Sequence, residues 1–551
     1  MTPRRALEQA LTDACERALG ISGVDPLLTP SAHADYQANF AMSLAKRLGE
    51  PPRAIAERVI AELDVEAEIA GPGFVNLTVP ADALAAWATE ALNDQRLGVP
   101  QAEPKTVVLD YSAPNVAKEM HVGHLRSTVI GDALARTLGF LGHTVDRQNH
   151  LGDWGTQFGM LVEHMLETGH EHVRSFDELG ELYRDAKRHY DEDAEFAVRA
   201  RERVVALQAH DPRTTELWQG LVDVSVAHMD EVYEALGVLL TDADIRGESF
   251  YNDSLDDTVD ALLAAGAAYE HDGAVLVASE RFRGKEGEPA VLIVRKSDGG
   301  YGYPATDFAT LRYSVDELHG DRLVYVTDAR QAQHFAIVFE VCERVGWLRS
   351  ATAEHVPFGM VLGDDRRPFK TRDGGTVPLA GLLAEAVSRA QAILDERGIS
   401  EDAALARTIG VGAVKWADLS SGRQHDYVFS FERMLALRGN TAPYVQYAHV
   451  RAVSVLEKGG TAATVREVAE PAERALVLQL AGFSDALAEV EARLEPHRLC
   501  GYLYEAANAF SAFYEACPIA GNGSRLALTE LTGRTLRTGL GLLGISAPER
   551  M

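Results

Sequence analysis

The sequence predicts an α/β fold with a doubly wound parallel sheet, followed by a region that is almost all helix. From residue 105, strand-like apolar runs alternate with amphipathic helical patterns, which is the order of consecutive strand–helix–strand units. From residue 377 to the end, apolar residues recur at helical spacing and strand signals are few. Because 551 residues exceed what one hydrophobic core supports, we expect several domains.

Residues 1–95 are expected to form a small α+β domain, which ends in a polar linker at 94–101. Its two strand patterns lie on either side of a Gly-Pro-Gly turn, which breaks any continuous element. The expected elements are helices at 4–19 and 35–48 and strands at 66–70 and 74–79.

Residues 101–380 are expected to form a nucleotide-binding domain that an insertion interrupts. The alternation breaks between about 165 and 290, where the chain is rich in charge and in helical pattern. A helical stem is expected at 381–430 and a separate helical domain at 431–551. The expected elements of the nucleotide-binding domain are strands at 105–111 and 144–149, helices at 122–140 and from Thr156, and resumed strands at 290–294 and 323–326.

Charge and cysteine content narrow the class of protein. The formal net charge is −29, from 53 basic and 82 acidic residues, which by itself argues against a nucleic-acid partner. A local basic face could still bind one, so the charge does not exclude RNA. No apolar run is long enough for a bilayer, and the N-terminus lacks a signal-peptide pattern. The four cysteines show no metal spacing, so we expect reduced thiols and a cytoplasmic protein.

The most informative segment runs from Pro114 to His124, between a strand pattern and a helical pattern, and ends in His-Val-Gly-His. His121 and His124 are three residues apart, so they share one face of the helix start. A helix start offers free N–H groups and a positive dipole end, which suit a phosphate. Gly123 would let a flat ring approach the backbone. The segment therefore predicts an ATP site without a P-loop.

A second polar, Gly-rich loop follows the resumed sheet at 358–375 and carries Lys370 and Arg372. Cations on such a loop suit a reaction that builds negative charge on phosphates. A solvated surface loop would have the same composition, so this segment by itself does not decide between the two interpretations.

Taken together, these and further segments resemble the class I aminoacyl-tRNA synthetases, specifically the arginyl-tRNA synthetases. The resemblance implies a Rossmann-type catalytic domain with an insertion, an N-terminal domain that binds the tRNA elbow, and a helical anticodon-binding domain. The further matching segments follow in the same order along the chain, at 149–159, 302–307, 328–335, 439–448 and 543–551.

The resemblance also implies the reaction. ATP, with Mg²⁺, would activate L-arginine to arginyl-adenylate, and the arginyl group would pass to the 3′-terminal adenosine of tRNA(Arg). In this family activation requires bound tRNA, and the enzyme is usually a monomer without a membrane partner. Class I enzymes usually transfer to the 2′-OH. No protein metal ligand is implied.

Several residue roles follow from the resemblance. The usual lysine loop of class I is degenerate here, with Phe369-Lys370-Thr371-Arg372 in its place. Phosphate contact would therefore fall on Lys118, which lies just before the histidines, as well as on Lys370. The backbone of Met360 and Val361 would face the adenine.

The implied arginine pocket is anionic. A guanidinium is a planar cation with five N–H donors, which carboxylates and amide or hydroxyl oxygens bind best. Glu248 follows a predicted strand, and Tyr303 and Asp307 are four residues apart, so they share a face if that segment is helical. Taken singly, Glu248 or Asp307 could equally be an ordinary carboxylate on the protein surface. The implied pocket residues are Asn115, Glu248, Tyr303, Asp307 and Gln331.

The implied tRNA contacts lie in both flanking domains. Asn76 falls where the family reads a base at the tRNA elbow, and Tyr444, Tyr447 and Met551 fall near the anticodon. Stacking of unpaired bases on aromatic rings is a common mode of RNA recognition. Ordinary core packing would explain tyrosines at this spacing equally well.

Two other classes of function share part of this pattern. A small-molecule nucleotidyltransferase would have the same histidine motif, but it would not need a long helical C-terminal domain. A non-catalytic RNA-binding relative would be expected to lose the histidines, and this chain keeps both.

Overall fold

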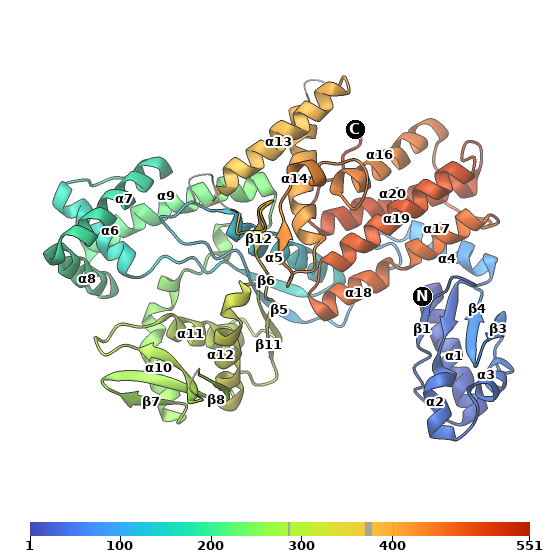
Figure 1. Ribbon diagram of the computed structural model, residues 1–551, viewed down its shortest axis with the longest axis horizontal. Helices are drawn as coiled ribbons and strands as arrows, with labels where there is room; N and C mark the ends of the chain where they lie inside the picture. Colours follow the sequence, from blue (N-terminus) through green and yellow to red (C-terminus); the bar gives the residue numbers. More distant parts are fainter. Residues whose placement is uncertain (285–286, 370–376, 400–401) are drawn as a thin grey trace.

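The computed structural model describes residues 1–551 except 285–286, 370–376 and 400–401 (Figure 1). A parallel sheet and its helices occupy the middle, and the C-terminal helices lie on the right of the view. The insertion extends to the left. The N-terminal domain forms a separate lobe at the lower right.

The N-terminal lobe is an antiparallel sheet of order β1-β2-β4-β3 packed with three helices. Thr2 caps the first helix, and Gly20 ends it in a left-handed conformation. The predicted helix at 35–48 is wrong in its first turn. Tyr36 and Ala38 are buried and Gln37 between them is less so, an alternation that suits a strand. The elements are α1 (Pro3–Leu19), β1 (Leu28–Pro30), β2 (Tyr36–Ala38), α2 (Phe40–Leu48), α3 (Pro52–Ile60), β3 (Ala67–Ala70) and β4 (Phe74–Leu77).

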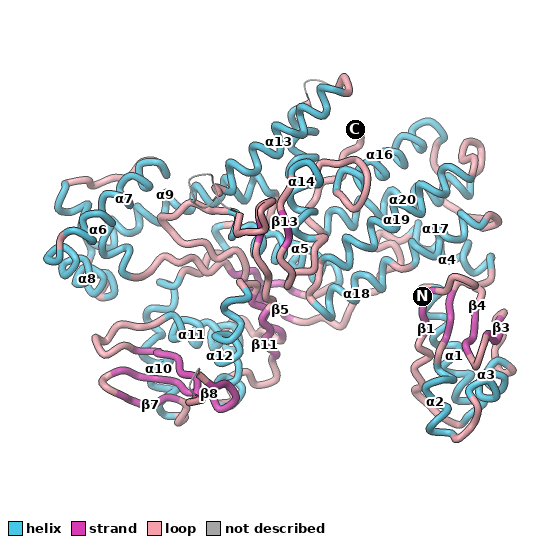
Figure 2. Tube along the Cα trace, in the orientation of Figure 1, coloured by secondary structure: helices cyan, strands magenta, loops and turns pink. Residues whose placement is uncertain are grey.

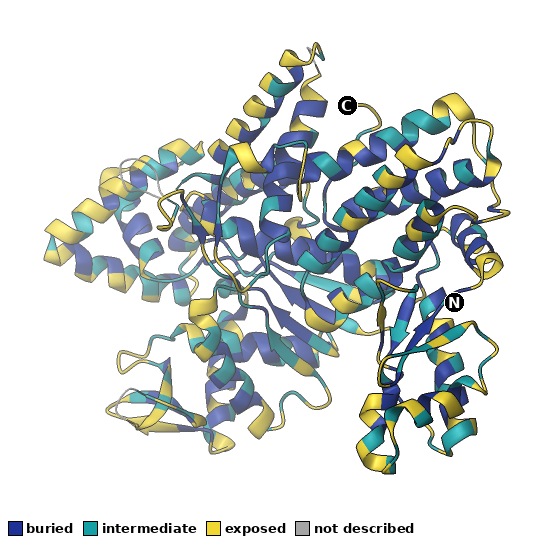
Figure 3. Cartoon of the chain, turned by 45° about the vertical axis from the view of Figure 1, so that its right-hand side comes forward, coloured by how far each residue is buried: buried dark blue, intermediate teal, exposed yellow. Residues whose placement is uncertain are grey.

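The central sheet is parallel, with the order β11-β10-β5-β6. It confirms the predicted strands at 105–111, 144–149 and 323–326 and the predicted helix at 122–140. Its two central strands, β5 and β10, are buried, whereas the edge strands β6 and β11 are only partly buried (Figure 3). The elements are β5 (Thr106–Asp110), α5 (Val122–Leu141), β6 (Thr144–Gln148), β10 (Arg322–Tyr325), α12 (Ala332–Arg344) and β11 (Thr352–His355).

The insertion has a helical part and a sheet part, which Figure 2 separates by colour. Its helical part confirms the charge-rich helical prediction. The strand at 290–294, however, does not rejoin the central sheet, because it pairs antiparallel with the neighbouring strand of the insertion. Its apolar run resembles a buried parallel strand, yet Val291 is 46% and Ile293 48% exposed. The elements are α6 (Thr156–Thr168), α7 (Phe176–Glu192), α8 (Ala194–Gln208), α9 (Pro212–Leu236), α10 (Leu255–Ala264), β7 (Ala268–His271), β8 (Ala274–Arg283), β9 (Pro289–Arg295) and α11 (Tyr303–Asp316).

The rest of the chain is helical, as predicted, apart from one short strand that pairs with a strand of the catalytic domain. α4 (Ala81–Asn93), which follows the N-terminal lobe, packs on this helical region rather than on the lobe's sheet. The elements are β12 (Val361–Leu362), α13 (Leu379–Glu396), α14 (Ala403–Leu419), β13 (Tyr427–Val428), α15 (Phe431–Met434), α16 (Ala442–Gly459), α17 (Pro471–Ala481), α18 (Phe483–Arg493), α19 (His497–Ala516) and α20 (Gly523–Leu542).

Buried ion pairs attach α5 to the C-terminal helices. The Arg126 guanidinium and the Asp418 carboxylate approach to 3.3 Å, and neither side chain is exposed. Six residues further along α5, Asp132 lies 3.8 Å from the buried ammonium of Lys415. Because each partner would be an uncompensated buried charge without the other, these contacts fix α14 against α5. In the described part of the chain, no helix is both long and apolar enough to cross a membrane.

Candidate active site at the carboxyl edge of the parallel sheet

The candidate site lies where the parallel strands end, which is the usual ligand site of such sheets. The Pro114–His124 segment follows β5, and the segment 149–153 follows β6. Gln331 lies in a short 3-10 helix (Ala329–Gln331) after β10, and Met360 follows β11. The topology therefore brings together residues that are far apart in the sequence.

Segment 149–153 joins the motif loop to the insertion and continues the strand pairing beyond the sheet. On one side, Asn115 pairs with Gly152. On the other, Asn149 pairs with Ile245, and the Glu248 N–H donates to the Leu151 carbonyl at 3.0 Å. The prediction that Glu248 follows a strand is wrong, because this residue begins a 3-10 helix (Glu248–Ser254). Asn115 and Glu248 thus approach the site from opposite sides of one segment.

The motif loop has a strained backbone that neighbouring side chains hold in place. Ser112, Ala113 and Ala117 all have positive φ angles, of 74°, 47° and 62°. Such angles are costly for residues other than glycine and persist where the surroundings enforce them. The enforcing acceptors are side-chain oxygens at 2.9–3.1 Å from the three N–H groups, supplied by Ser127, Asn149 and Ser225 respectively. No local pattern indicates this support, because the acceptors come from α5, from the segment after β6 and from α9.

Replacing Asn149 by alanine should loosen this loop. The change removes the oxygen that accepts the Ala113 N–H and the amide that donates to the Tyr233 hydroxyl at 3.1 Å. Loss of these bonds should lower kcat/KM by about tenfold, the size of one buried hydrogen bond. Amide hydrogen exchange at Ser112–Ala117 should accelerate. Asn149→Asp keeps an acceptor oxygen and serves as the control; equal effects of both variants would contradict the assignment.

The two motif histidines form a stacked pair at the start of α5. His121 is the N-cap residue, and its Nδ1 accepts the Gly123 N–H at 3.0 Å. Nδ1 of His124 accepts the His121 N–H at 3.1 Å, and the ring centroids are 4.0 Å apart. A Cβ at position 123 would lie 2.8 Å from the His121 ring, so the glycine makes room for that ring. The proposed approach of a flat ligand to Gly123 stays a prediction.

The predicted use of free helix N–H groups is wrong for this helix start. The Val122 N–H donates to the Val377 carbonyl at 3.0 Å, and the His124 N–H donates to the His121 carbonyl at 2.8 Å. With the Gly123 N–H bound to the His121 ring, these donors are satisfied within the chain. Donation to a phosphate would therefore come from the imidazoles themselves.

Burial keeps both imidazoles neutral. Burial lowers the pKa of His124 to about 3, and the neighbouring His121 adds to this effect. Burial, with the charge of Lys118, also lowers the pKa of His121. Because Nδ1 of each neutral ring accepts a hydrogen bond, the proton belongs on Nε2. The pair can donate two hydrogen bonds to an anion at neutral pH without adding charge.

Of the two lysines predicted to bind phosphate, the structure describes only Lys118. Lys118 is exposed and lies just before the histidines. Lys370 and Arg372 lie outside the described residues, but both flanks of their loop are placed. The Phe369 N–H donates to the Val361 carbonyl at 3.0 Å, and Val377 is bound to the helix start of α5. Phe369 and Val377, the described residues on either side, therefore both lie near this site.

The backbone expected to face adenine is partly engaged already. The Met360 N–H donates to Asp426 at 2.6 Å, and its carbonyl accepts the Tyr427 N–H at 3.2 Å. The Val361 carbonyl accepts the Phe369 N–H. Adenine recognition by these two residues stays a prediction, and its hydrogen bonds would have to share or replace these.

Tyr303 and Asp307 do lie on one helix, as their spacing predicted. α11 begins at Tyr303, and Asp307 follows in its second turn. Asp307 binds Nε2 of His334 at 2.6 Å, which orients its carboxylate. His334 was not singled out from the sequence, although it lies within the matching segment 328–335. Gln331, three residues before it, is exposed at the start of α12.

Acidic side chains gather in this part of the site, and burial and mutual repulsion shift their pKa values. Burial raises the pKa of Glu248 to about 8, and repulsion from Asp153 and Asp307 adds to it. Burial also raises the pKa of Asp153, whose carboxylate accepts the Ser249 N–H at 3.0 Å and so holds the segment beside Glu248. Partly buried carboxyl groups that repel one another when ionised are suited to a cationic ligand, which would relieve the repulsion.

Asn76 lies in β4 within a polar row across the N-terminal sheet. It is 9% exposed, and its side-chain oxygen accepts a hydrogen bond from Gln37 at 2.9 Å. Gln37 and Glu68 are its partners on the adjacent strands, and Thr29 pairs with Gln37. The row supports a polar contact surface, while the role of Asn76 stays a prediction.

The two anticodon-side tyrosines differ in exposure. Tyr444 is turned toward α19, where its hydroxyl donates to Asn508 at 2.8 Å. Tyr447 is 38% exposed, and the Arg451 guanidinium lies 5.0 Å from its ring. Tyr447 is therefore the more accessible of the two, whereas Tyr444 contributes to packing, and base stacking by either stays a prediction. Met551 is partly buried against the core.

Three family models match successive parts of the chain. Residues 4–79 match the arginyl tRNA synthetase N terminal domain, residues 88–431 the catalytic domain of tRNA synthetases class I (R), and residues 445–551 the DALR anticodon binding domain. The anticodon-binding match covers the chain from α16 to residue 551, and the N-terminal-domain match covers the N-terminal lobe.

Curated relatives and solved structures agree. The arginine–tRNA ligase of Frankia casuarinae is 51% identical over 99% of this chain and 98% of its own, and that of Thermobifida fusca is 48% identical over the whole of both. The arginyl-tRNA synthetase structure of Plasmodium falciparum has a TM-score of 0.86 at 28% identity, over 99% of each chain. The arginyl-tRNA synthetase structure of Thermus thermophilus has a TM-score of 0.82 at 27% identity, over 100% of each chain. The resemblance and the fold predicted from the sequence are confirmed: this chain belongs to the arginyl-tRNA synthetase family of class I.

Proposed function

We propose that the protein ligates L-arginine to tRNA(Arg) at the expense of ATP. One observation carries the proposal: the acidic side chains of Glu248 and Asp307 lie near each other, at the same sheet edge as the neutral donor pair His121 and His124. The first suits a guanidinium and the second suits phosphate oxygens. Family membership supports the combination.

In the first step, a carboxylate oxygen of arginine attacks the α-phosphorus of ATP. A bond forms between that oxygen and phosphorus, and the bond to the β-phosphate oxygen breaks, releasing pyrophosphate. Nε2–H of His121 and His124, with the ammonium of Lys118, would stabilise the charge that develops on the phosphates. Asn115, Tyr303, Asp307 and Gln331 would orient the amino acid, and Lys370 would share the phosphate contact.

Mg²⁺ would enter with ATP. Among the described residues, no group of three or more His, Cys, Asp or Glu side chains is arranged to hold a metal ion. Mg²⁺ commonly keeps phosphate oxygens and water as ligands, so we expect ATP to hold it, and when bound it would neutralise phosphate charge.

In the second step, the 2′-OH of the terminal adenosine attacks the activated carbonyl of arginyl-adenylate. The new ester bond forms, the bond to the phosphate oxygen breaks, and AMP leaves with the proton transferred from the hydroxyl. No protein side chain forms a covalent intermediate. Binding of the tRNA would involve Asn76 at its elbow and Tyr447, with Tyr444 and Met551 nearby, at its anticodon.

We also propose that the protein works as a monomer in the cytoplasm. Cys15, Cys342, Cys500 and Cys517 are buried and form no disulfide, which suits a reducing compartment. Light scattering of the purified protein, alone and with tRNA, tests the oligomeric state.

A charging assay tests the proposed function. Purified protein is mixed with ATP, total tRNA and radiolabelled arginine, with lysine and glutamine as controls. Acid-precipitable label from arginine alone is the expected result. Charging with a control amino acid, or none with arginine, would overturn the proposal. Activity that survives truncation near residue 430 would favour a small-molecule nucleotidyltransferase.

Arginine affinity should rise with pH up to about 8 and then level off. In the empty pocket most Glu248 is protonated at neutral pH, because its pKa is raised to about 8. The guanidinium stabilises the carboxylate, so binding lowers this pKa and releases a proton. Below the pKa of the empty site, affinity can gain up to about tenfold per pH unit.

Calorimetry in buffers of different ionisation enthalpy, between about pH 6.5 and 9, measures both the affinity and the proton release. Glu248→Gln removes the titrating group and should flatten the profile at a lower affinity. A wild-type profile that is already flat would show that Glu248 is ionised before arginine binds.

A further inference from the structure

The N-terminal lobe meets the rest of the protein at a short connection. β4 ends at Leu77 and α4 begins at Ala81, so only Thr78, Val79 and Pro80 join them. α4 itself is fixed to the C-terminal helices. Thr89 exchanges hydrogen bonds with the backbone of Val465 at 3.1 and 2.9 Å. Any rotation of the lobe relative to the body would therefore occur about this connection.

The ion pair between Asp35 and Arg474 binds Val79, the middle residue of the connection, and we call these three residues the clamp. The Asp35 carboxylate, in the lobe, accepts the Val79 N–H at 2.6 Å. Arg474, on α17, binds the same carboxylate through two nitrogens, with Nε at 2.7 Å from Oδ1, and it also donates to the Val79 carbonyl. The N–H group of Val79 is thus bound by a residue of the lobe, and its carbonyl is bound by a residue of the C-terminal helical region. The Asp35 side chain is almost fully buried, which keeps water out of the pair.

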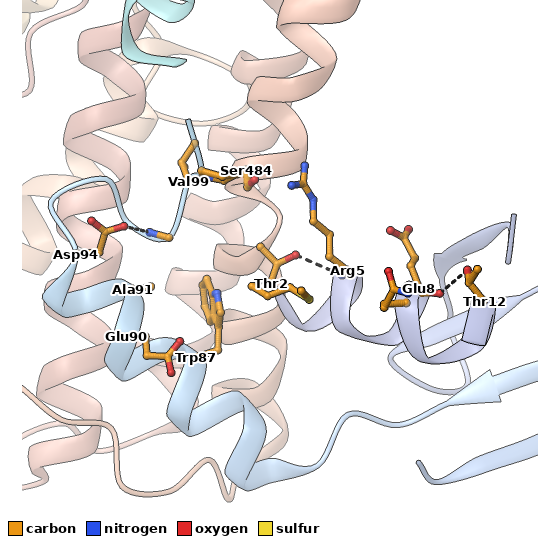
Figure 4. A pocket seen from close by; sticks show the side chains of 14 residues that line it. Thr2, Arg5, Glu8, Thr12, Trp87, Glu90, Ala91, Asp94, Val99 and Ser484 are labelled. Atoms are coloured by element: carbon orange, nitrogen blue, oxygen red, sulfur yellow. Dashed lines mark hydrogen bonds between the residues drawn. The ribbon is translucent and has the colours of Figure 1, made fainter. Parts of the chain in front are cut away.

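Between the lobe and the helical region, a cavity interrupts the packing. A cavity of about 740 Å³ lies between α1, α4, the following linker and α18, and Figure 4 shows side chains around it. Its lining mixes apolar Trp87 with polar Arg5, Glu90 and Ser484. A second, looser ion pair crosses the same region, where Arg4 lies 3.3 Å from Asp485. Because this cavity interrupts the apolar packing between the lobe and the helical region, polar contacts contribute to the angle of the lobe.

The clamp residues also adjoin the strands that carry the polar row of Thr29, Gln37, Asn76 and Glu68. Asp35 directly precedes β2, which contributes Gln37, and Val79 follows β4, which contributes Asn76. A change in the clamp would therefore turn this row as a unit. The sheet itself would stay intact, because its strands are paired independently of Arg474.

We propose that Asp35 and Arg474 are positioning residues, which lock the Val79 connection and hold the polar row of the N-terminal sheet at the angle needed for tRNA. The inference rests on the proposed function. A tRNA is stiff and must meet the lobe, the active site and the C-terminal helices at once. A lobe free to rotate would lower the effective concentration of its surface for the bound tRNA.

A graded series at Arg474 tests the proposal. Arg474→Met should raise KM for tRNA by about tenfold, within the usual range of coupling between sites, and leave kcat and arginine affinity unchanged. Arg474→Lys keeps the charge but not the two-pronged contact and should have a smaller effect. Arg474→Glu should be the worst, since it sets a carboxylate against Asp35. Asp35→Asn should resemble Arg474→Met.

Arg498→Met is the matched control, because Arg498 also pairs with acids in the helical domain but away from the lobe. Its tRNA KM should stay at the wild-type value. An unchanged tRNA KM in Arg474→Met, or a loss of kcat or arginine affinity in step with it, would overturn the proposal. Circular dichroism before each assay confirms that the variants are folded.

A double-mutant cycle with Asn76→Ala separates the clamp from the proposed tRNA contact. If the clamp acts by positioning the row, the effects of Asn76→Ala and Arg474→Met on tRNA KM should be less than additive. If both single variants raise the tRNA KM, full additivity of the two effects would overturn the positioning role. A wild-type tRNA KM in Asn76→Ala with a raised one in Arg474→Met would reject Asn76 as the contact and keep the clamp. No arginine charging by the parent protein would instead reject the proposed function.

Discussion

Replacing Asp307 by alanine should weaken arginine binding by about a hundredfold to a thousandfold and leave ATP binding nearly unchanged. Asp307 lies in α11, and His334 orients its carboxylate toward the site. The guanidinium would lose a charged, bidentate acceptor in a half-buried pocket, where such contacts are strongest. Calorimetric titration of arginine and of ATP into the tRNA-bound protein measures both affinities.

Two variants make the Asp307 experiment specific. Asp316→Ala removes a carboxylate from the same helix, where it forms an exposed ion pair with Arg349, and should change neither affinity. Asp307→Asn keeps the shape and the contact with His334 but loses the charge, so it should retain only a small part of the arginine affinity. Equal losses of arginine and ATP binding in Asp307→Ala would mean that the residue supports the fold of the site as a whole.

Replacing His124 by asparagine should slow adenylate formation by about a hundredfold to a thousandfold, the cost of losing one preorganised donor to a developing charge. Nδ1 of this ring holds the His121 N–H, and its Nε2–H is the group available to phosphate. An asparagine oxygen can replace Nδ1 as the acceptor, but its side chain does not reach the place of Nε2. Pyrophosphate exchange in the presence of tRNA measures the step.

His124→Gln gives the complementary test, because its longer side chain can place a donor near the position of Nε2 while giving up the contact at Nδ1. It should therefore be more active than His124→Asn. Filter binding should show an unchanged affinity for tRNA in both. If asparagine proves the better substitute, the ring acts mainly by capping the helix, and the phosphate contact must come from elsewhere. Because burial keeps the pKa of His124 near 3, its contribution should not change across neutral pH.

Local patterns predicted the elements that carry the site. The alternation around 105–149 gave the first strands and α5, and the four-residue spacing placed Tyr303 and Asp307 on one helix. These predictions succeed because helix and strand periods depend on neighbouring residues. The strand at 290–294 shows the limit, since an apolar run does not reveal which sheet it joins.

Contacts between distant segments were not predictable in the same way. Nothing near Ala113 indicates that Asn149 accepts its N–H, and nothing near Asp307 indicates that His334 orients it. The N–H groups at the start of α5 were expected to be free, and only the return of the chain at Val377 shows that one of them is taken. Each of these partners is supplied by another element, so its position depends on packing.

The sequence by itself determined the family, the order of its domains and the chemical character of the site, because residue types at fixed spacing specify both the helix start and its histidines. The tertiary structure decided which groups face a ligand. Burial sets the protonation of His124 and Glu248, and long-range hydrogen bonds fix the strained motif loop. It also revealed the Asp35–Val79–Arg474 clamp, since a polar contact between two separately folded parts leaves no mark on the periodicity of either.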